Sequence, residues 1–313
     1  GVDIGGATTD VFSVFKGQFN RTVSANLGMS YSICNVLAES GYSSISRWLP
    51  FEIDQEDLTN RISNKMIRPT TIPQSLEELI VEQALAREAL SLSFRQHKQF
   101  AVSLKGVQQK RTISDAFEQS TSGKTLVNMK ELNLIVGSGG VLSHAPRRSQ
   151  SFMMMIDAFK PLGITDIAVD SIFMMPQLGV LSSIHPEAAL EVFNKDCLIR
   201  LGTSINPIVK GKVDNNELFT YSFKYKDKNY KGALKSGQIE FFPIPYEPIE
   251  VVFEPSNNVD LGNGFGQKVE SRVSGGEVGL MLDGRLNDSD GQIVIENKKV
   301  LADWYKKMKV YNL

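Results

Sequence analysis

The first ten residues of the chain hold its strongest candidates for chemistry. They read Gly1-Val2-Asp3-Ile4-Gly5-Gly6-Ala7-Thr8-Thr9-Asp10. A short apolar strand brings the Asp3 carboxylate to a glycine-rich turn, where backbone N–H groups can converge on phosphate oxygens. A carboxylate beside phosphates repels them unless a cation lies between, so Asp3 predicts Mg²⁺, held through water. The alternative interpretation is a plain glycine-rich hairpin corner.

A second glycine-rich turn follows an apolar run much further along the chain. The run Leu132–Val136 predicts a buried strand, and it leads into Gly137, Gly139 and Gly140. A helical stretch comes next. Glycines at the end of a buried strand allow close approach of a ligand to the backbone. Such strand ends are common in α/β proteins, so this turn indicates a ligand site only in combination with the first turn.

Several elements must position these two turns. The segments 11–15 and 19–23 predict a β-hairpin directly after the first turn. Helices are predicted over 31–39, 54–65 and 75–98, and Ser75 with Glu78 has the spacing of a capping box. Residues 206–296 alternate apolar and polar side chains between turn residues, which predicts a β-rich region. A terminal helix is predicted over 303–309, and 260–268 is interpreted as a glycine-rich loop between strands.

Composition excludes several classes of protein. The chain of 313 residues has 35 acidic and 34 basic residues, a balance that argues against non-specific binding of nucleic acid. The mildly basic segment 105–111 is therefore interpreted as a solvated insertion. No apolar stretch is long enough for a transmembrane helix. Cys34 and Cys197 are expected to be core thiols, the three histidines lack metal-binding spacing, and the cytoplasm is the expected location.

The two turns, in this order, resemble two motifs of the actin-like ATPases. The segment Asp3–Asp10 resembles the second phosphate loop of heat-shock chaperones and of the bacterial cell-division actin. The turn after Val136 resembles the adenosine motif of the same proteins. The resemblance implies ATP or ADP with Mg²⁺ as ligands. The helix over 75–98 is similar to one that touches adenine in heat-shock chaperones, and Glu82 and Arg87 are its candidates for that contact.

Four longer strings resemble one family within that group, the GlmL family, also called the MutL-like proteins of glutamate mutase gene clusters. These strings are Asp3–Asp10, Ser138–Pro146, Ala168–Pro176 and Asp260–Gly262. The family is unrelated to the mismatch-repair MutL. The resemblance implies a reactivating ATPase whose partners are the subunits of an adenosylcobalamin-dependent glutamate mutase. No cobalamin-binding motif is found in the chain, so the cofactor is expected on the partner.

The resemblance also implies roles for individual residues. Asp3 and Asp10 are the expected catalytic residues. Asp3 would orient Mg²⁺ or the attacking water, and Asp10 would either assist the metal or anchor the hairpin. The loop residues that would hold the β- and γ-phosphates are Gly5, Gly6, Ala7, Thr8 and Thr9. The residues that would face adenosine are Gly137, Gly139 and Gly140.

The expected fold is α/β, with an actin-like (ribonuclease-H-like) lobe over 1–205 and a β-rich C-terminal domain over 206–313. A helical insertion is expected near 50–125. Actin-like ATPases carry two phosphate loops and this chain shows one, so we expect the N-terminal lobe to lie outside it and the chain alone to be inactive. The alternatives are a small-molecule kinase of the same superfamily and a non-catalytic actin-like interaction scaffold.

Overall fold

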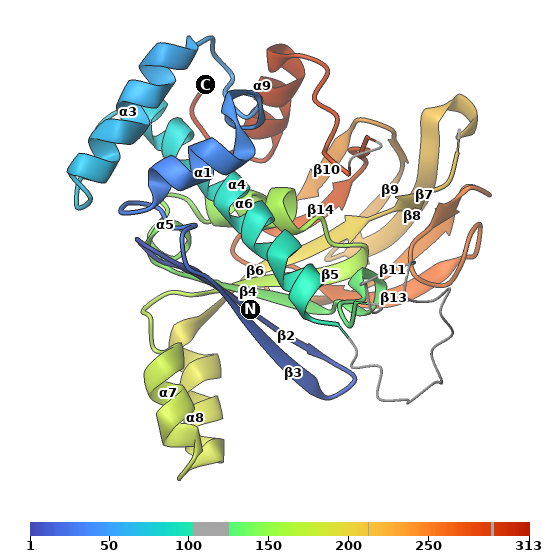
Figure 1. The fold of residues 1–313 in the computed structure, drawn as a ribbon. Helices are drawn as coiled ribbons and strands as arrows, with labels where there is room; N and C mark the ends of the chain where they lie inside the picture. The colour runs from blue at the N-terminus through green and yellow to red at the C-terminus, as the bar shows by residue number, and fades with distance from the viewer. Residues whose placement is uncertain (103–124, 212, 289–290) are drawn as a thin grey trace, which may run out of the picture.

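The computed structural model describes residues 1–102, 125–211, 213–288 and 291–313. The fold is mixed α/β and is built on an eight-stranded sheet with the order β10-β14-β6-β5-β4-β1-β2-β3 (Figure 1). The strands of its N-terminal part are β1 (Val2–Ile4), β2 (Thr9–Phe15), β3 (Gln18–Ser24), β4 (Leu134–Ser138), β5 (Gly163–Asp170) and β6 (Leu198–Asn206). The predicted hairpin is confirmed as the antiparallel pair of β2 and β3. The segment 105–111 lies outside the described residues.

One face of this sheet is covered by two long helices. Helix α4 (Leu76–Phe100) contacts β2 and β3, and α6 (Arg148–Phe159) contacts β4, β5 and β6. The predicted capping box at Ser75 is confirmed. A further layer packs against α4, made of α1 (Ile33–Ser40) and α2 (Tyr42–Ser46), with α3 (Gln55–Ile67) against α1. No helix in the described part of the chain is long and apolar enough to cross a membrane.

The chain after β5 first leaves the sheet and then returns to it. Helices α7 (Met175–Ser182) and α8 (Pro186–Val192) project away from the body of the molecule (Figure 1). The strands and the helix that follow are β7 (Ile208–Val209), β8 (Glu217–Tyr225), β9 (Lys228–Lys235), β10 (Ile239–Phe242), β11 (Pro248–Pro255), β12 (Val259–Asp260), β13 (Val269–Ser274), β14 (Gly279–Asp283) and α9 (Lys298–Lys307). The region is β-rich, as its alternation predicted.

The C-terminal strands are divided among three sheets, one of which is the antiparallel pair of β7 and β12. Four of them form a separate sheet with the order β13-β11-β8-β9, whereas β14 and β10 extend the main sheet beyond β6. Leu280 and Leu282 belong to the core cluster of the second sheet, and Met281 between them belongs to the core under the helices. Because successive side chains of a strand point to opposite faces, β14 is packed on both sides. The main sheet therefore crosses the boundary expected at residue 205.

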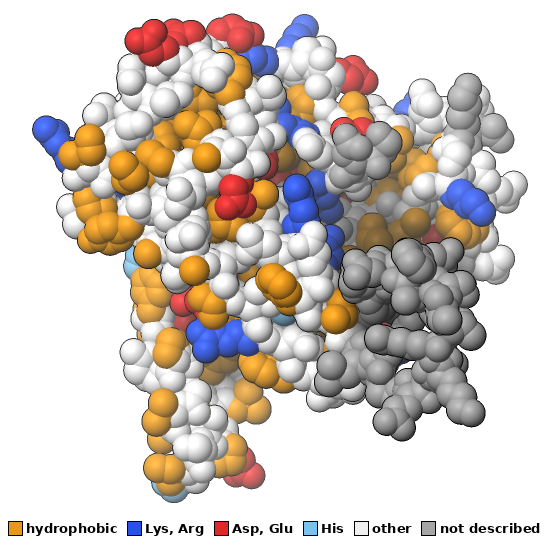
Figure 2. Space-filling model, in the orientation of Figure 1, with side chains coloured by type: hydrophobic (Ala, Val, Ile, Leu, Met, Phe, Trp, Pro, Cys, Tyr) orange, Lys and Arg blue, Asp and Glu red, His pale blue; other side chains and the backbone are white. Residues whose placement is uncertain are grey.

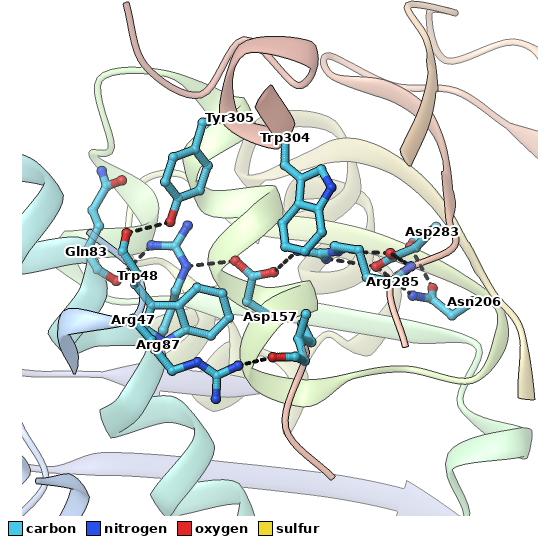
Figure 3. Close-up of polar contacts among 12 residues, drawn as sticks. Arg47, Trp48, Gln83, Arg87, Asp157, Asn206, Asp283, Arg285, Trp304 and Tyr305 are labelled. Carbon is cyan, nitrogen blue, oxygen red and sulfur yellow. Dashed lines mark hydrogen bonds and ion pairs between the residues drawn. The ribbon is translucent and has the colours of Figure 1, made fainter. Parts of the chain in front are cut away.

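A buried ionic network joins distant parts of the chain (Figure 3). Asp157 on α6 accepts hydrogen bonds from Arg87 of α4, at 2.7 Å, and from Arg285 after β14, at 2.8 Å. The second carboxylate on Arg285 is that of Asp283, at 2.8 Å. The side chains of Asp157, Arg87 and Arg285 are 0–1 % exposed. Because ionised groups so deep in a protein are tolerated only when paired, this network fixes the relative positions of α4, α6 and the C-terminal segment.

A buried histidine attaches the hairpin to α4. The ring nitrogens of His97 lie 2.9 Å from Thr22 Oγ1 on β3 and 2.8 Å from Ser13 Oγ on β2. Burial lowers the pKa of His97 to about 4, from an ordinary value of 6.5. The imidazole is therefore neutral in the folded protein at neutral pH, and both of its nitrogens are used to hold the hairpin.

This arrangement predicts a specific pH dependence of stability. Between pH 6.5 and about 4 the unfolded chain binds a proton at His97 that the folded chain does not, so this contribution is complete above pH 6.5 and falls as the pH falls. Between neutral pH and about pH 5, the wild type should lose roughly 1–2 kcal/mol more unfolding free energy than His97→Gln. Urea unfolding at several pH values measures this difference. Parallel pH profiles for the two proteins would contradict the prediction.

Candidate functional site

The two glycine-rich turns meet at the carboxyl ends of two neighbouring strands of the main sheet. Strands β1 and β4 are parallel neighbours, with Asp3 beside Ser138, and β4 is parallel to β5. Strand β2, which follows β1 in the chain, pairs with β1 on the side away from β4. Strand β5, which follows β4 in the chain, pairs with β4 on the side away from β1. Ligands of open α/β sheets bind outside the carboxyl ends of strands where the order reverses in this way. Both turns lie at such a point.

The carbonyl groups of the first turn are all engaged. The Gly5 N–H donates to Thr8 O at 2.9 Å and closes the turn. The segment 28–32 donates backbone and side-chain hydrogen bonds to the carbonyl oxygens of Gly5, Gly6 and Ala7. With its carbonyls held on that side, the turn is fixed in one orientation.

The position of Gly28 explains how this segment comes so close. A Cβ atom at Gly28 would lie 2.5 Å from the backbone of Ala7, so only glycine fits there. Gly28 and the hydroxyls of Ser30 and Ser32 were not predicted from the sequence as parts of the site. The sequence feature that could have indicated them is a glycine followed by two serines, a short distance after the first glycine-rich turn.

After Gly5, the next three amide groups of the turn have no partner in the described part of the chain. Within the described residues, the N–H groups of Gly6, Ala7 and Thr8 have no hydrogen-bond acceptor, and Gly6 and Ala7 are exposed. Successive free amides of this kind bind anions. Thr9 differs from its neighbours because its side chain is fully buried and its hydroxyl donates to Leu27 O. Its hydroxyl therefore stabilises the turn and is not available to a ligand.

Asp3 lies on β1, the strand that leads into this turn. Its carboxylate is half-buried and makes no hydrogen bond or ion pair with any described residue. Burial raises the pKa of Asp3, and the negative charges of Asp10 and Asp170 raise it further. A nearby positive charge would therefore stabilise the ionised form of this carboxylate.

The two neighbouring acids are already bound to protein groups. Asp10 forms an ion pair of 2.7 Å with Arg21 across the hairpin, which agrees with an anchoring role. Asp170, at the end of β5, is buried and accepts N–H groups of Ile172 and Met175. Asp170 was not predicted from the sequence as part of the site. The sequence feature that could have indicated it is an acidic residue directly after the predicted strand 164–169.

No group of three or more His, Cys, Asp or Glu side chains in the described part of the chain could hold a metal ion. A metal role for Asp3 therefore requires ligands from outside the described residues. Mg²⁺ is commonly held by one or two carboxylates, substrate phosphates and water, so a single carboxylate beside phosphate-binding amides fits this ion. The metal role of Asp3 stays a prediction.

The three glycines of the second turn have different surroundings. A Cβ on Gly137 would lie 2.6 Å from Met155 Sδ, so this buried glycine packs against α6 and does not face an open site. Gly139 has φ +101°, and its Cβ would lie 2.1 Å from the carbonyl oxygen of Ile4. Gly140, at the start of α5 (Gly140–Ser143), has no atom near its missing Cβ. Only Gly140 is open to a ligand.

A cleft of about 630 Å³ connects the two turns with the helices. Gly5, Gly6 and Gly140 line its floor, and the connection between α3 and α4, with the first turns of α4, lines its wall. Glu82 lines this wall and pairs with Lys65 at 2.9 Å. Arg87, the other candidate for contact with adenine, is buried in the ionic network and does not line the cleft.

The two adjacent glycines predict opposite responses to alanine. Gly139→Ala forces a side chain into the Ile4 carbonyl at a φ that L residues rarely adopt, so we expect a loss of several kcal/mol, or failure to fold. Gly140→Ala adds a methyl group in open space at a helix start and should change stability by less than about 1 kcal/mol. Urea unfolding followed by circular dichroism compares them. Equal stability of the two variants would contradict the close contact between β1 and the second turn.

Comparison with known proteins identifies the family. The model of the family described as MutL protein matches residues 1–197. A curated relative, Protein MutL of Clostridium tetanomorphum, is 25% identical over 214 residues, which cover 62% of this chain and 44% of that protein. The matched region thus spans less than half the length of that relative, and no solved structure matches the chain. Because the family model covers more than half of the chain, the chain belongs to the MutL family, the glutamate mutase-associated family whose motifs it carries.

Proposed function

We propose that this chain is the nucleotide-binding part of a chaperone- or reactivase-type ATPase that acts on an adenosylcobalamin-dependent glutamate mutase. One observation carries the proposal: within the described residues, the amides of Gly6, Ala7 and Thr8 have no acceptor, and they follow directly the strand that carries the Asp3 carboxylate, which has no hydrogen bond or ion pair there either. Anion donors and a lone acid at one place suit a phosphate ligand accompanied by a divalent cation. A plain hairpin corner has no need of either feature.

The first turn, of which Gly5 and Gly6 line the cleft, would bind Mg·ATP together with Asp3 and the cleft. The free amides would hold the β- and γ-phosphates, and Asp3 would orient the water shell of Mg²⁺, which supplies charge for phosphoryl transfer. Gly140 would face the nucleoside. The cleft volume of about 630 Å³ lies within the usual range for small-molecule sites, roughly 300–1,000 Å³.

The electrostatics of Asp3 support this assignment. Burial and two neighbouring carboxylates raise its pKa, so the ionised form is disfavoured in the protein alone. A bound divalent cation would reverse that effect by attracting the ionised carboxylate. The site would then accept the metal and the phosphates together more readily than either one singly.

The whole protein would couple nucleotide turnover to its partner by movement of lobes around the nucleotide. The partner follows from the association of the family with glutamate mutase. A kinase would need a free carboxylate base aimed at its substrate. Glu82, which lines the cleft, is paired with Lys65 and therefore does not supply such a base.

Replacement of Asp3 tests the metal-linked part of the proposal. Asp3→Ala should weaken ADP binding by about tenfold or more when Mg²⁺ is present, and should leave binding in EDTA nearly unchanged. Because the carboxylate makes no hydrogen bond or ion pair with the described residues, the variant should be at least as stable as the wild type. Isothermal titration calorimetry with the chain of residues 1–313 measures both affinities. Wild-type affinity for Mg·ADP in the variant would remove Asp3 from the site.

A matched pair of glycines tests the position of the nucleoside. Gly140 and Gly179 both lie in helices and both have open space where a side chain would go, but only Gly140 lines the cleft. Gly140→Val should weaken ADP binding, because its branched side chain enters the cleft. Gly179→Val, on α7, should bind ADP like the wild type. Equal affinities in the two folded variants would contradict a nucleoside beside Gly140.

A further inference from the structure

Helix α4 lines a second cavity, of about 410 Å³, which is separate from the cleft. Cationic side chains from three elements reach it: Arg47 directly follows α2, Arg95 and Lys98 lie on α4, and Lys160 directly follows α6. We call this cavity the basic pocket. Figure 2 shows Lys and Arg side chains gathered in a hollow in the middle of the face in view.

The cations of the basic pocket are positioned mainly by neutral groups. Arg47 donates to the Gln292 side chain and to Ile293 O, and Lys160 donates to Gly291 O. These contacts orient the two side chains without neutralising them. Arg95 makes no hydrogen bond or ion pair with any described residue, and Lys98 lies 4.8 Å from the centre of the Phe94 ring.

The nearby acids do not fully compensate these charges. Burial lowers the pKa of Arg47, although Glu88 and Asp288 act in the opposite direction. Burial and Arg47 lower the pKa of Lys160, against the effect of Glu88, and burial lowers that of Lys98. Glu39 also lines the pocket, and Asp157 is already held by Arg87 and Arg285. The charged forms of Arg47, Lys98 and Lys160 are therefore less stable here than in water, and an added anion would relieve that cost.

We propose that the basic pocket binds a small anion that carries a phosphate group. Cations that converge from three elements suit an anion with charge and acceptor oxygens on several sides. Phosphate, with about two negative charges and three strong acceptor oxygens, meets this description better than a carboxylate. The volume allows a phosphorylated metabolite of modest size. This site does not depend on the nucleotide proposal, because none of these cations lines the cleft.

Tryptophan fluorescence offers a local test. Trp48 lines the basic pocket and its Nε1–H donates to Glu88 at 2.8 Å, whereas Trp304 donates to Gly237 O. Titration of the chain of residues 1–313 with sodium phosphate, with ionic strength held constant by sodium chloride, should give a saturable change in emission. That change should disappear in Trp48→Phe. A change that is linear in phosphate, or that persists in Trp48→Phe, overturns the proposal.

Charge-removing variants complete the test. Arg95→Gln and Lys98→Gln should each weaken phosphate binding by about tenfold, because each removes one charged donor. Lys307→Gln, which breaks an exposed pair with Glu240, is the control and should bind phosphate like the wild type. Unchanged affinity in both pocket variants, or an equal loss in the control, overturns the proposal. The Trp48 emission separates this site from the Gly6–Thr8 amides, because Trp48 lines the basic pocket and does not line the cleft.

Discussion

Asp157 lies on α6 between the guanidinium groups of Arg87 and Arg285, and none of these side chains is open to solvent. A buried ion of this kind is tolerated only while its partners stay in place, so the three segments that carry them depend on one another. Arg87, near the middle of α4, attaches this helix to Asp157. Its C-terminal half then holds the hairpin through His97, and its N-terminal half lines the cleft. Much of the architecture around the candidate site therefore follows from a single carboxylate.

In the first turn, the backbone carbonyl groups and the backbone amide groups have different roles. The segment 28–32 engages the carbonyl oxygens, and this leaves the amides of Gly6, Ala7 and Thr8 for a ligand. The cost of keeping amides unpaired is small because they are at the surface, where water can reach them. The acid at the end of β1 supplies the opposite charge. A site of this kind is built largely from the main chain, so its composition alone says little about its geometry.

The local parts of the fold could be predicted from the sequence. The capping box at Ser75 and the hairpin of β2 and β3 rest on contacts between residues close in the chain, and such contacts leave a visible pattern. Of the candidate site, Gly5 and Gly6 of the first turn line one cleft with Gly140. Gly137 does not, because whether a strand glycine faces a ligand or a helix depends on packing by Met155. Gly28 and Asp170 were missed because their roles come from residues distant in sequence.

The passage of the main sheet through β6 into β14 and β10 has a mechanical consequence. Five strand spacings of about 4.8 Å separate β1 from β10, a distance of roughly 24 Å. Hydrogen-bonded strands resist sliding, and the core packs on both faces of β14. The turn after β1 and the far edge at β10 are thus parts of one stiff plate. A tilt imposed at one end therefore becomes a displacement at the other.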